Sequence, residues 1–154
     1  MTAHGAASRS KALATWIAIV GGALGLHRFY LHGLRDAWGW VFPLPTLLGI
    51  IGVQRALALG QDDRLSWLLI PLLGLSLSVA MLMAIVYALT ADEVWDRRFN
   101  PDGPATHSGW VVVIGAAVAL LLGAGVLMAT VAFAGQRFFE YQAAVAAISR
   151  TATG

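Results

Sequence analysis

The sequence has no cysteine and few charged residues. The absence of cysteine excludes disulfide bonds, thiolate catalysis and cysteine-ligated metal sites. Charged residues make up 12% of the 154 residues and hydrophobic residues 58%, whereas about 25% of a soluble domain is charged. A soluble domain of this length would need many more polar side chains to cover its surface, so the composition favours a protein surrounded by lipid.

Charge is also missing from long stretches of the chain. Residues 65–89 and 110–133 run for 25 and 24 residues without Asp, Glu, Lys, Arg or His. At a rise of about 1.5 Å per residue, each forms a helix longer than the hydrocarbon core of a bilayer, which is about 30 Å thick. Each stretch therefore predicts a transmembrane helix.

Two shorter apolar stretches come first, at 12–26 and 37–53, and with 15 and 17 residues both are short for a span. We expect the first helix to gain length by continuing through residues 29–31, with the Arg28 side chain extending toward the lipid headgroups. None of the eight acidic and ten basic residues lies in the four stretches, which fits the cost of placing charge in lipid. The sequence thus predicts an all-α integral membrane protein with four transmembrane helices in two hairpins.

These stretches divide the chain into four parts. A polar segment (1–10) precedes the first hairpin (11–59), and the second hairpin (60–134) contains a polar loop (90–109). The remaining residues, 135–154, form a C-terminal tail. Apolar side chains at steps of three, four and three residues predict an amphipathic helix there, with the face Phe138, Tyr141, Val145 and Ile148.

A short turn at residues 60–64 joins the two hairpins. Gly60 suits the end of the helix before it, because glycine adopts the left-handed conformation without strain. Asp62 or Asp63 can accept hydrogen bonds from the first turn of the helix that follows. We therefore expect a tight helix–turn–helix connection.

Basic residues that flank the spans indicate an orientation. With four spans, the N-terminus, the turn at residues 60–64 and the C-terminus share one side, whose basic residues are Arg9, Lys11, Arg55, Arg64, Arg137 and Arg150. The other side carries Arg28, Arg35, Arg97 and Arg98. Because the cytoplasmic side of a membrane protein usually carries more Lys and Arg, six basic residues against four favour both termini in the cytoplasm.

Residues that carry chemistry are few and scattered. The formal net charge is +2 and no basic stripe is present, so we expect no nucleic-acid partner. No nucleophile is paired with a base, and no cluster of His and carboxylates has metal-ligand spacing. We therefore expect a protein that is not an enzyme and that holds no cofactor or metal ion. A divalent-ion site of His107 with the acidic residues of the polar loop remains a weaker alternative to a solvated loop.

The strongest local pattern is Gly-Gly-Ala-Leu-Gly-Leu-His-Arg-Phe-Tyr-Leu at residues 21–31. Gly21 and Gly25 lie one helical turn apart, which opens a face for close approach of a neighbouring backbone. His27 and Arg28 then mark the exit from the membrane, and the rings of Phe29 and Tyr30 are expected at headgroup depth, before Leu31.

At these residues the chain resembles the TM-two domain family, whose members have two membrane helices joined by a loop with His-Arg-Phe or Asp-Arg-Phe. The residues that match in order are Lys11, Gly21, Gly22, Gly25, His27, Arg28, Phe29, Tyr30 and Leu31. His32 replaces the glycine expected next, and residues 52–55 lack the acidic residue expected after the second helix. The resemblance covers residues 9–57 and implies a bacterial type with no activity that can be carried over.

Pro43 and Pro45 lie inside the second apolar stretch. Each proline removes a backbone hydrogen bond and clashes with the preceding turn, so we expect a kink. A kink that serves packing is the simpler interpretation. Because interrupted helices line the substrate sites of some transporters, a small channel or transporter that uses this kinked helix is the alternative function.

Small residues recur every four positions at Gly115, Ala119 and Gly123. They give a smooth stripe for helix packing, either within the protein or between subunits. The sequence therefore favours a non-enzymatic scaffold or accessory subunit that acts through helix–helix contacts. Its expected surroundings are the lipid bilayer of a bacterial inner membrane, with a membrane protein partner or a homo-oligomer.

Overall fold

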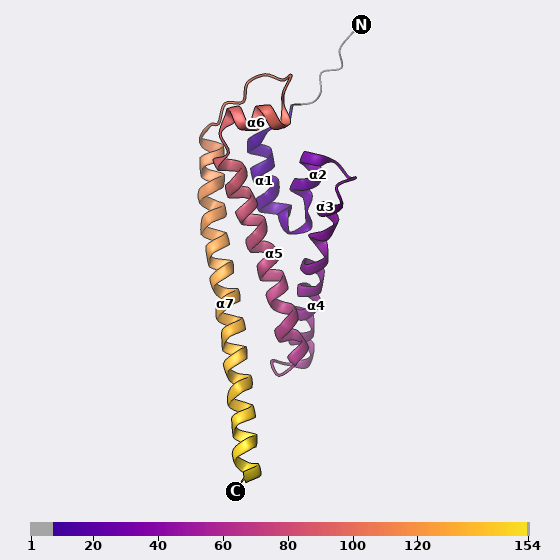
Figure 1. Cartoon of the computed structure of the whole chain (residues 1–154), viewed down its shortest axis with the longest axis vertical. Helices are drawn as coiled ribbons and strands as arrows, with labels where there is room; N and C mark the ends of the chain where they lie inside the picture. Colours follow the sequence, from indigo (N-terminus) through magenta and orange to yellow (C-terminus); the bar gives the residue numbers. More distant parts are fainter. Residues whose placement is uncertain (1–7, 154) are drawn as a thin grey trace.

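The computed structural model describes residues 8–153, which contain helices and no strand. Residues 1–7 of the expected polar segment lie outside the described part of the chain. The elements in order are α1 (Lys11–Gly21), η1 (Gly22–Leu24, a 3-10 turn), α2 (Leu26–His32), α3 (Ala37–Val41), α4 (Pro43–Leu59), α5 (Arg64–Leu89), α6 (Asp92–Phe99) and α7 (Trp110–Thr153). Figure 1 shows α5 between α7 on one side and α4 on the other.

Three helices of the described chain are long and apolar enough to cross a membrane. They are Ala37–Leu59, which joins α3 and α4, then α5, then α7. The first predicted span, at residues 12–26, is not among them, because the apolar helix Lys11–Leu24 is too short to cross. The all-helical class of the prediction is confirmed, whereas four spans in two hairpins are not.

The first apolar stretch folds back on itself. The Tyr30 hydroxyl at the end of α2 accepts a hydrogen bond of 2.9 Å from the Ser10 N–H at the start of α1, so the two helices run antiparallel. At the turn, Gly22 lies against Ala80, nine residues before the end of α5 or about 14 Å along its axis. The α1–α2 hairpin therefore reaches about a third of the way along α5, as Figure 1 shows.

This hairpin changes the placement of the termini. The Arg9 N–H donates to the Asn100 side-chain oxygen at 2.7 Å, so α1 begins beside α6, where the four-span scheme put the opposite membrane face. Figure 1 shows the start of α1 and the end of α7 at opposite ends of the molecule. The expectation that both termini lie on one side is thus not supported. If the α1–α2 hairpin does not cross, three spans remain, and an odd number of spans puts the two ends of the described chain on opposite sides.

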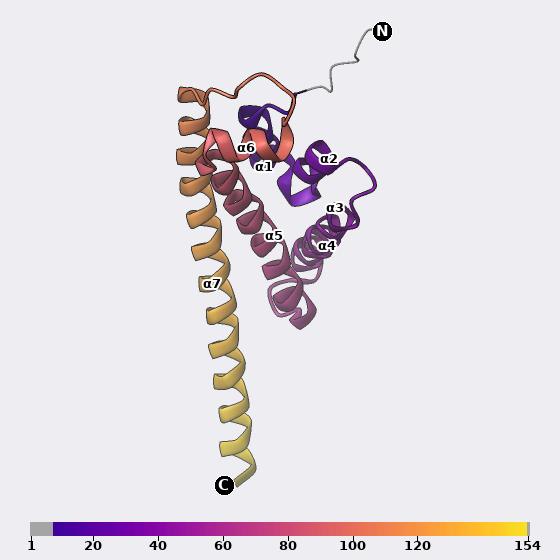
Figure 2. The ribbon, with the colours of Figure 1, turned by 45° about the horizontal axis from the view of Figure 1, so that its top comes forward.

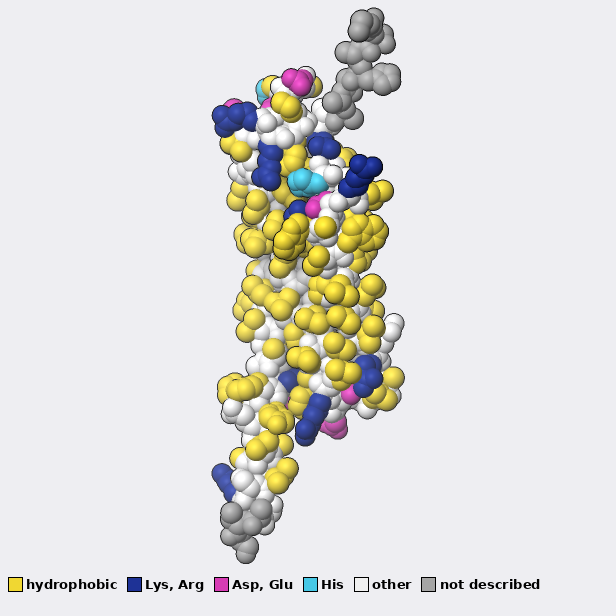
Figure 3. All heavy atoms as spheres, turned by 45° about the vertical axis from the view of Figure 1, so that its right-hand side comes forward, with side chains coloured by type: hydrophobic (Ala, Val, Ile, Leu, Met, Phe, Trp, Pro, Cys, Tyr) yellow, Lys and Arg dark blue, Asp and Glu magenta, His cyan; other side chains and the backbone are white. Residues whose placement is uncertain are grey.

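Small residues fill the core and large ones face outward. Six of the ten buried apolar residues in the described chain are alanines, such as Ala80 and Ala84 of α5. Leu68, Leu121 and many other large side chains are exposed, and Figure 3 shows them as a broad apolar belt between two charged ends. This is the reverse of a soluble core, and it is typical of helices that associate in lipid through close backbone contact.

The turn between α4 and α5 has the predicted caps. Gly60 ends α4 at a φ of 90°, and the Asp63 carboxylate accepts a hydrogen bond from the Ser66 N–H at 3.2 Å. Arg55 also donates two hydrogen bonds to Asp63, at 3.0 and 2.9 Å. Asp63 therefore closes the turn and caps α5 at once.

The last helix, α7, is 44 residues long. It continues through Gly135 without a break, so the predicted tail is the direct extension of the last span. At about 1.5 Å per residue it measures roughly 66 Å, about twice the thickness of a hydrocarbon core. Figures 1 and 2 show its C-terminal part extending well beyond the other helices.

Candidate functional site

The turn of the α1–α2 hairpin depends on its glycines. Gly25 has a φ of 76°, and a Cβ there would collide with the Gly39 carbonyl oxygen. That carbonyl is also deprived of a helical donor, because Pro43, four residues later, has no N–H. A Cβ at Gly21 would meet the Leu26 side chain of the same hairpin. Gly21 therefore shapes the turn, Gly25 lets the backbone of α3 approach closely at Gly39, and Gly22, which was not predicted for this role, contacts α5 at Ala80.

His27 lies at the centre of the hairpin with its side chain fully buried. Neither ring nitrogen has a hydrogen-bond partner among the described residues. The Phe42 ring stands edge-on to the imidazole with centroids 5.3 Å apart, and the Tyr87 ring lies at 5.8 Å. Because buried polar atoms are almost always hydrogen-bonded, His27 is an unusual group.

Arg28 and His32 converge on Asp36 in the loop after α2. The Arg28 Nε–H donates to the Asp36 carboxylate at 2.6 Å, and the His32 Nδ1 lies 3.9 Å from the same oxygen. The hydrogen bond from Arg28 is the main cause that lowers the pKa of Asp36 below its usual value. Asp36 also accepts a hydrogen bond from the Trp38 N–H at 3.2 Å and so caps α3.

The rest of the motif makes internal contacts. The Phe29 ring fills the space beside Gly39, where a Cβ would collide with it. Leu31 is 1% exposed and packs with Trp95 of α6. Together with the Tyr30 hydrogen bond described above, these contacts hold the hairpin against α3 and α6. The structure thus places Phe29, Tyr30 and Leu31 in the internal packing of the hairpin, and the predicted membrane exit stays a prediction.

A polar contact at mid-depth joins three segments. The Thr46 hydroxyl lies 2.7 Å from the Ala23 carbonyl oxygen and 3.0 Å from the Ser76 hydroxyl. Thr46 and Ser76 are 4% and 6% exposed. The Ala23 carbonyl belongs to the 3-10 turn, so this contact supplies a partner that the broken helix lacks. Sequence reasoning missed the group because its members are far apart in the chain.

A second polar contact fixes the start of α1. The Lys11 ammonium, on a residue 4% exposed, donates to the Thr90 carbonyl at 2.5 Å, the Asp92 carboxylate at 2.9 Å and the Ser108 hydroxyl at 2.8 Å. All three of its protons therefore have acceptors. Hydrogen bonds from Ser108 and then Lys11 lower the pKa of Asp92 from 3.8 to about 2.

The polar loop uses its acidic residues internally. The Thr106 backbone N–H donates to Asp96 at 2.7 Å, and the Thr106 hydroxyl bonds to the same carboxylate. No group of three His, Asp or Glu side chains in residues 8–153 is arranged to hold a metal ion. These hydrogen bonds therefore fix the loop over the ends of α1, α5 and α7.

The predicted packing stripe on α7 faces the bundle. A Cβ at Gly115 would lie 2.9 Å from the Thr15 side chain of α1, and one at Gly123 would lie 2.7 Å from the Met81 side chain of α5. Ala119 between them is fully buried. Of the two alternatives left open by the sequence, the structure shows packing within the protein.

The tight turn between α4 and α5 was predicted, but the glycines at the contact of the two helices were not. A Cβ at Gly49 would collide with the backbone of Leu73, and one at Gly52 would lie 2.6 Å from Leu69. Pro43 and Pro45 occupy the first turn of α4, after a one-residue interruption of the helix at Phe42.

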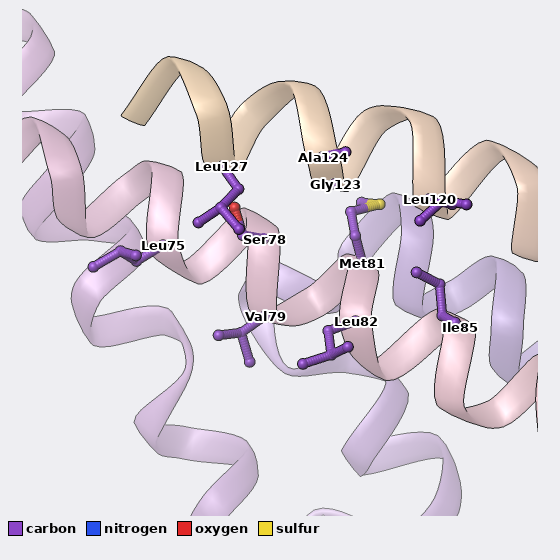
Figure 4. A pocket seen from close by; sticks show the side chains of 10 residues that line it. All are labelled: Leu75, Ser78, Val79, Met81, Leu82, Ile85, Leu120, Gly123, Ala124 and Leu127. Carbon is purple, nitrogen blue, oxygen red and sulfur yellow. The ribbon is translucent and has the colours of Figure 1, made fainter. Parts of the chain in front are cut away.

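A cavity of ≈ 360 Å³ separates α5 from α7 near the middle of the bundle (Figure 4). Its lining is apolar apart from Ser78, whose hydroxyl donates to the Gly74 carbonyl of its own helix at 2.8 Å. The cavity thus has no polar group available to bind a polar ligand, and its apolar lining suits lipid acyl chains.

Functional residues thus gather at the hairpin and at the α6 end. His27 and Arg28 come from the predicted motif, and Lys11 is one of the residues that match the family pattern. His32, Thr46 and Ser76 were not predicted as site residues. No nucleophile–base pair is among these contacts in the described chain. Comparisons with protein-family models, with curated proteins and with solved structures found no match to this chain.

Proposed function

We propose that the chain is a small non-enzymatic membrane protein of the TM-two domain type, a scaffold or accessory subunit that acts through helix contacts. The observation that carries this proposal is the C-terminal part of α7. It extends past the bundle as a straight helix that no other described element covers. A membrane protein partner or a second copy of the chain would pack on this extension.

The extension presents an apolar face for such a contact. Its residues Phe138, Tyr141, Val145 and Ile148 are 56%, 46%, 48% and 68% exposed. Near the bundle, Arg64 lies 5.4 Å from the Tyr141 ring. Val145 and Ile148 lie beyond that contact and are exposed. A partner helix could therefore pack on the same face of α7 that α5 contacts nearer the bundle.

A bacterial inner membrane remains the proposed location. In the three-span arrangement, the end of the molecule with α6 carries Arg9, Lys11, Arg28, Arg35, Arg97 and Arg98. The opposite end carries Arg55, Arg64, Arg137 and Arg150. Six against four now favours a cytoplasmic α6 end, with the α7 extension on the other side.

Crosslinking in native membranes tests the scaffold proposal. Because the chain has no cysteine, Val145→Cys introduces a single attachment point for a maleimide photo-crosslinker on the apolar face. Ala143→Cys is the control, since it lies about 160° away around the helix. The proposal predicts a specific crosslinked species from Val145→Cys alone. Monomer only from both variants would contradict it.

Transport is the second candidate, and His27 is the observation that favours it. A buried ionisable side chain without a partner among the described residues is typical of ion and proton pathways when it lies within a membrane, and hairpins that do not cross the membrane occur where their backbone lines a cavity. Ion flux into proteoliposomes would separate the two functions. Flux that is lost in His27→Leu and in Pro43→Ala with Pro45→Ala would favour transport, and absence of flux in the unaltered protein would exclude it.

A further inference from the structure

Two hollows meet at the α6 end of the molecule. The first, which we name the cationic cavity, has a volume of ≈ 290 Å³ and lies between α2, α5 and α6. Two arginines, Arg28 and Arg98, and one histidine, His32, line it, and no acidic residue does. The second, the apolar groove, has a volume of ≈ 510 Å³ and runs between α3, α4 and α5.

Arg28 and Met83 line both hollows, so the cavity and the groove adjoin. From Met83 to Leu72 the groove follows α5 for eleven residues, about 16 Å. Its lining is otherwise almost wholly apolar, with Trp38 at the end near Arg28. A ligand that fits both hollows has a polar head beside the cations and an apolar tail directed into the bilayer.

The charges of the cavity are only partly neutralised. Asp36 pairs with Arg28 at 2.6 Å, and the nearest acidic residues of α6 have other partners, since Asp92 binds Lys11 and Asp96 binds Thr106. Arg98 lies 5.4 Å from the Phe99 ring and forms no ion pair among the described residues. An anionic head would therefore supply a counter-charge that the protein lacks.

From this geometry we propose that the protein binds an anionic phospholipid of the surrounding membrane. Its phosphate lies in the cationic cavity, bound by Arg28, His32 and Arg98, and one acyl chain lies in the apolar groove. Basic pockets between membrane helices bind such headgroups. Figure 3 shows a histidine among basic side chains above a broad apolar face, which is the order of groups that a lipid requires. The proposal holds whether the chain is a scaffold or a transporter.

The test measures lipid retained by the full-length protein in detergent, by native mass spectrometry. Phosphatidylglycerol and phosphatidylcholine with the same acyl chains are titrated separately. We expect phosphatidylglycerol to bind about tenfold more tightly, because phosphatidylcholine carries the same phosphate together with a quaternary ammonium that the cations of the cavity repel. Equal binding of the two lipids would overturn the proposal.

Two neighbouring arginines on α6 give a matched pair of variants. Arg98→Gln removes a cation that lines the cavity, whereas Arg97→Gln removes the same charge from an exposed residue that does not line it. We expect the preference for phosphatidylglycerol to be lost in Arg98→Gln and kept in Arg97→Gln. The same loss in both would indicate general charge attraction and overturn the assignment of the site.

Inorganic phosphate distinguishes a lipid from a free anion. The apolar groove contributes only when the ligand has acyl chains, so millimolar phosphate should not displace bound phosphatidylglycerol. Displacement by phosphate at concentrations similar to those of the lipid would show that the anion alone is the ligand, and would overturn the proposal.

Discussion

Lys11 and Asp92 form an ion pair of 2.9 Å that joins the first residue of α1 to the first residue of α6. Lys11 is almost fully buried and Asp92 is 26% exposed. The same ammonium bonds the carbonyl of Thr90 at the end of α5 and the hydroxyl of Ser108 just before α7. One side chain thus connects four segments and keeps the start of α1 at the α6 end of the molecule.

Replacing Lys11 should loosen this end of the protein. Lys11→Met keeps the volume of the side chain but leaves Asp92 without its buried cation, and we expect a loss of about 2 kcal/mol in the free energy of unfolding. Denaturation of the purified protein in detergent measures it. Arg35→Met, which removes an exposed cation, should change stability by less than about 0.5 kcal/mol. Equal losses from the two variants would contradict the structural role of Lys11.

Stability should fall in acid over a defined range. The pKa of Asp92 and that of Asp63 are both lowered from 3.8 to about 2, by hydrogen bonds from Ser108 and Lys11 in one case and from Arg55 and Ser66 in the other. A carboxyl group whose pKa is lower in the folded state than in the unfolded state stabilises the fold at any pH above the unfolded-state pKa. This stabilisation is lost as the pH falls through the folded-state pKa. Melting temperature in detergent should therefore be level above pH 4 and drop between about pH 4 and pH 2.

The control for this pH dependence is the Asp63→Asn with Asp92→Asn variant. It should be less stable at pH 7 and its melting temperature should vary less between pH 4 and pH 2. An unchanged acid transition in the double variant would show that other groups cause it.

Glycines at the α4–α5 contact should not tolerate a methyl group. Gly49→Ala places a Cβ against the backbone of Leu73, and overpacking of this kind costs about 1–3 kcal/mol. Gly135→Ala is the control, because nothing in the described structure lies within 4 Å of its Cβ position, and alanine should stabilise the helix by up to about 1 kcal/mol. Melting temperatures that move in the same direction would contradict this packing.

His27 should lower stability in the natural sequence. Its ring nitrogens are buried without partners in the described chain, so His27→Leu replaces unsatisfied polar atoms with an apolar group. We expect a gain of about 1–2 kcal/mol in the free energy of unfolding. His32→Leu, at a residue 37% exposed, should have little effect. Loss of stability in His27→Leu would indicate that the imidazole has a bound partner such as water or an ion.

Much of the fold follows from the sequence because lipid imposes simple rules. The uncharged stretches 65–89 and 110–133 lie in α5 and α7, and Gly60 and Asp63 cap the turn between α4 and α5 as predicted. Those features depend on neighbouring residues alone. By contrast, the C-terminal tail is continuous with α7, because nothing at Gly135 ends a helix that is otherwise rich in alanine.

The fold-back of the first stretch was missed, and its signal was local but ambiguous. Gly21, Gly22 and Gly25 suit both a helix-packing face and a turn, and only Gly25 adopts a positive φ. The choice between them depends on the Gly39 carbonyl and on Ala80, which approach from distant parts of the chain. The Lys11 contacts were missed for the same reason, since Asp92 is 81 residues away.

The proposal that the α1–α2 hairpin does not cross the membrane is tested most directly by the membrane side of three single cysteines. Ser8→Cys, Asp102→Cys and Ala147→Cys each place one thiol in an otherwise cysteine-free chain, and an impermeant maleimide added to intact cells or to inverted vesicles reports the side. The account predicts that Ser8→Cys and Asp102→Cys react from one side and Ala147→Cys from the other. Reaction of Ser8→Cys and Ala147→Cys from the same side would mean that the first stretch crosses the membrane, and would contradict the account.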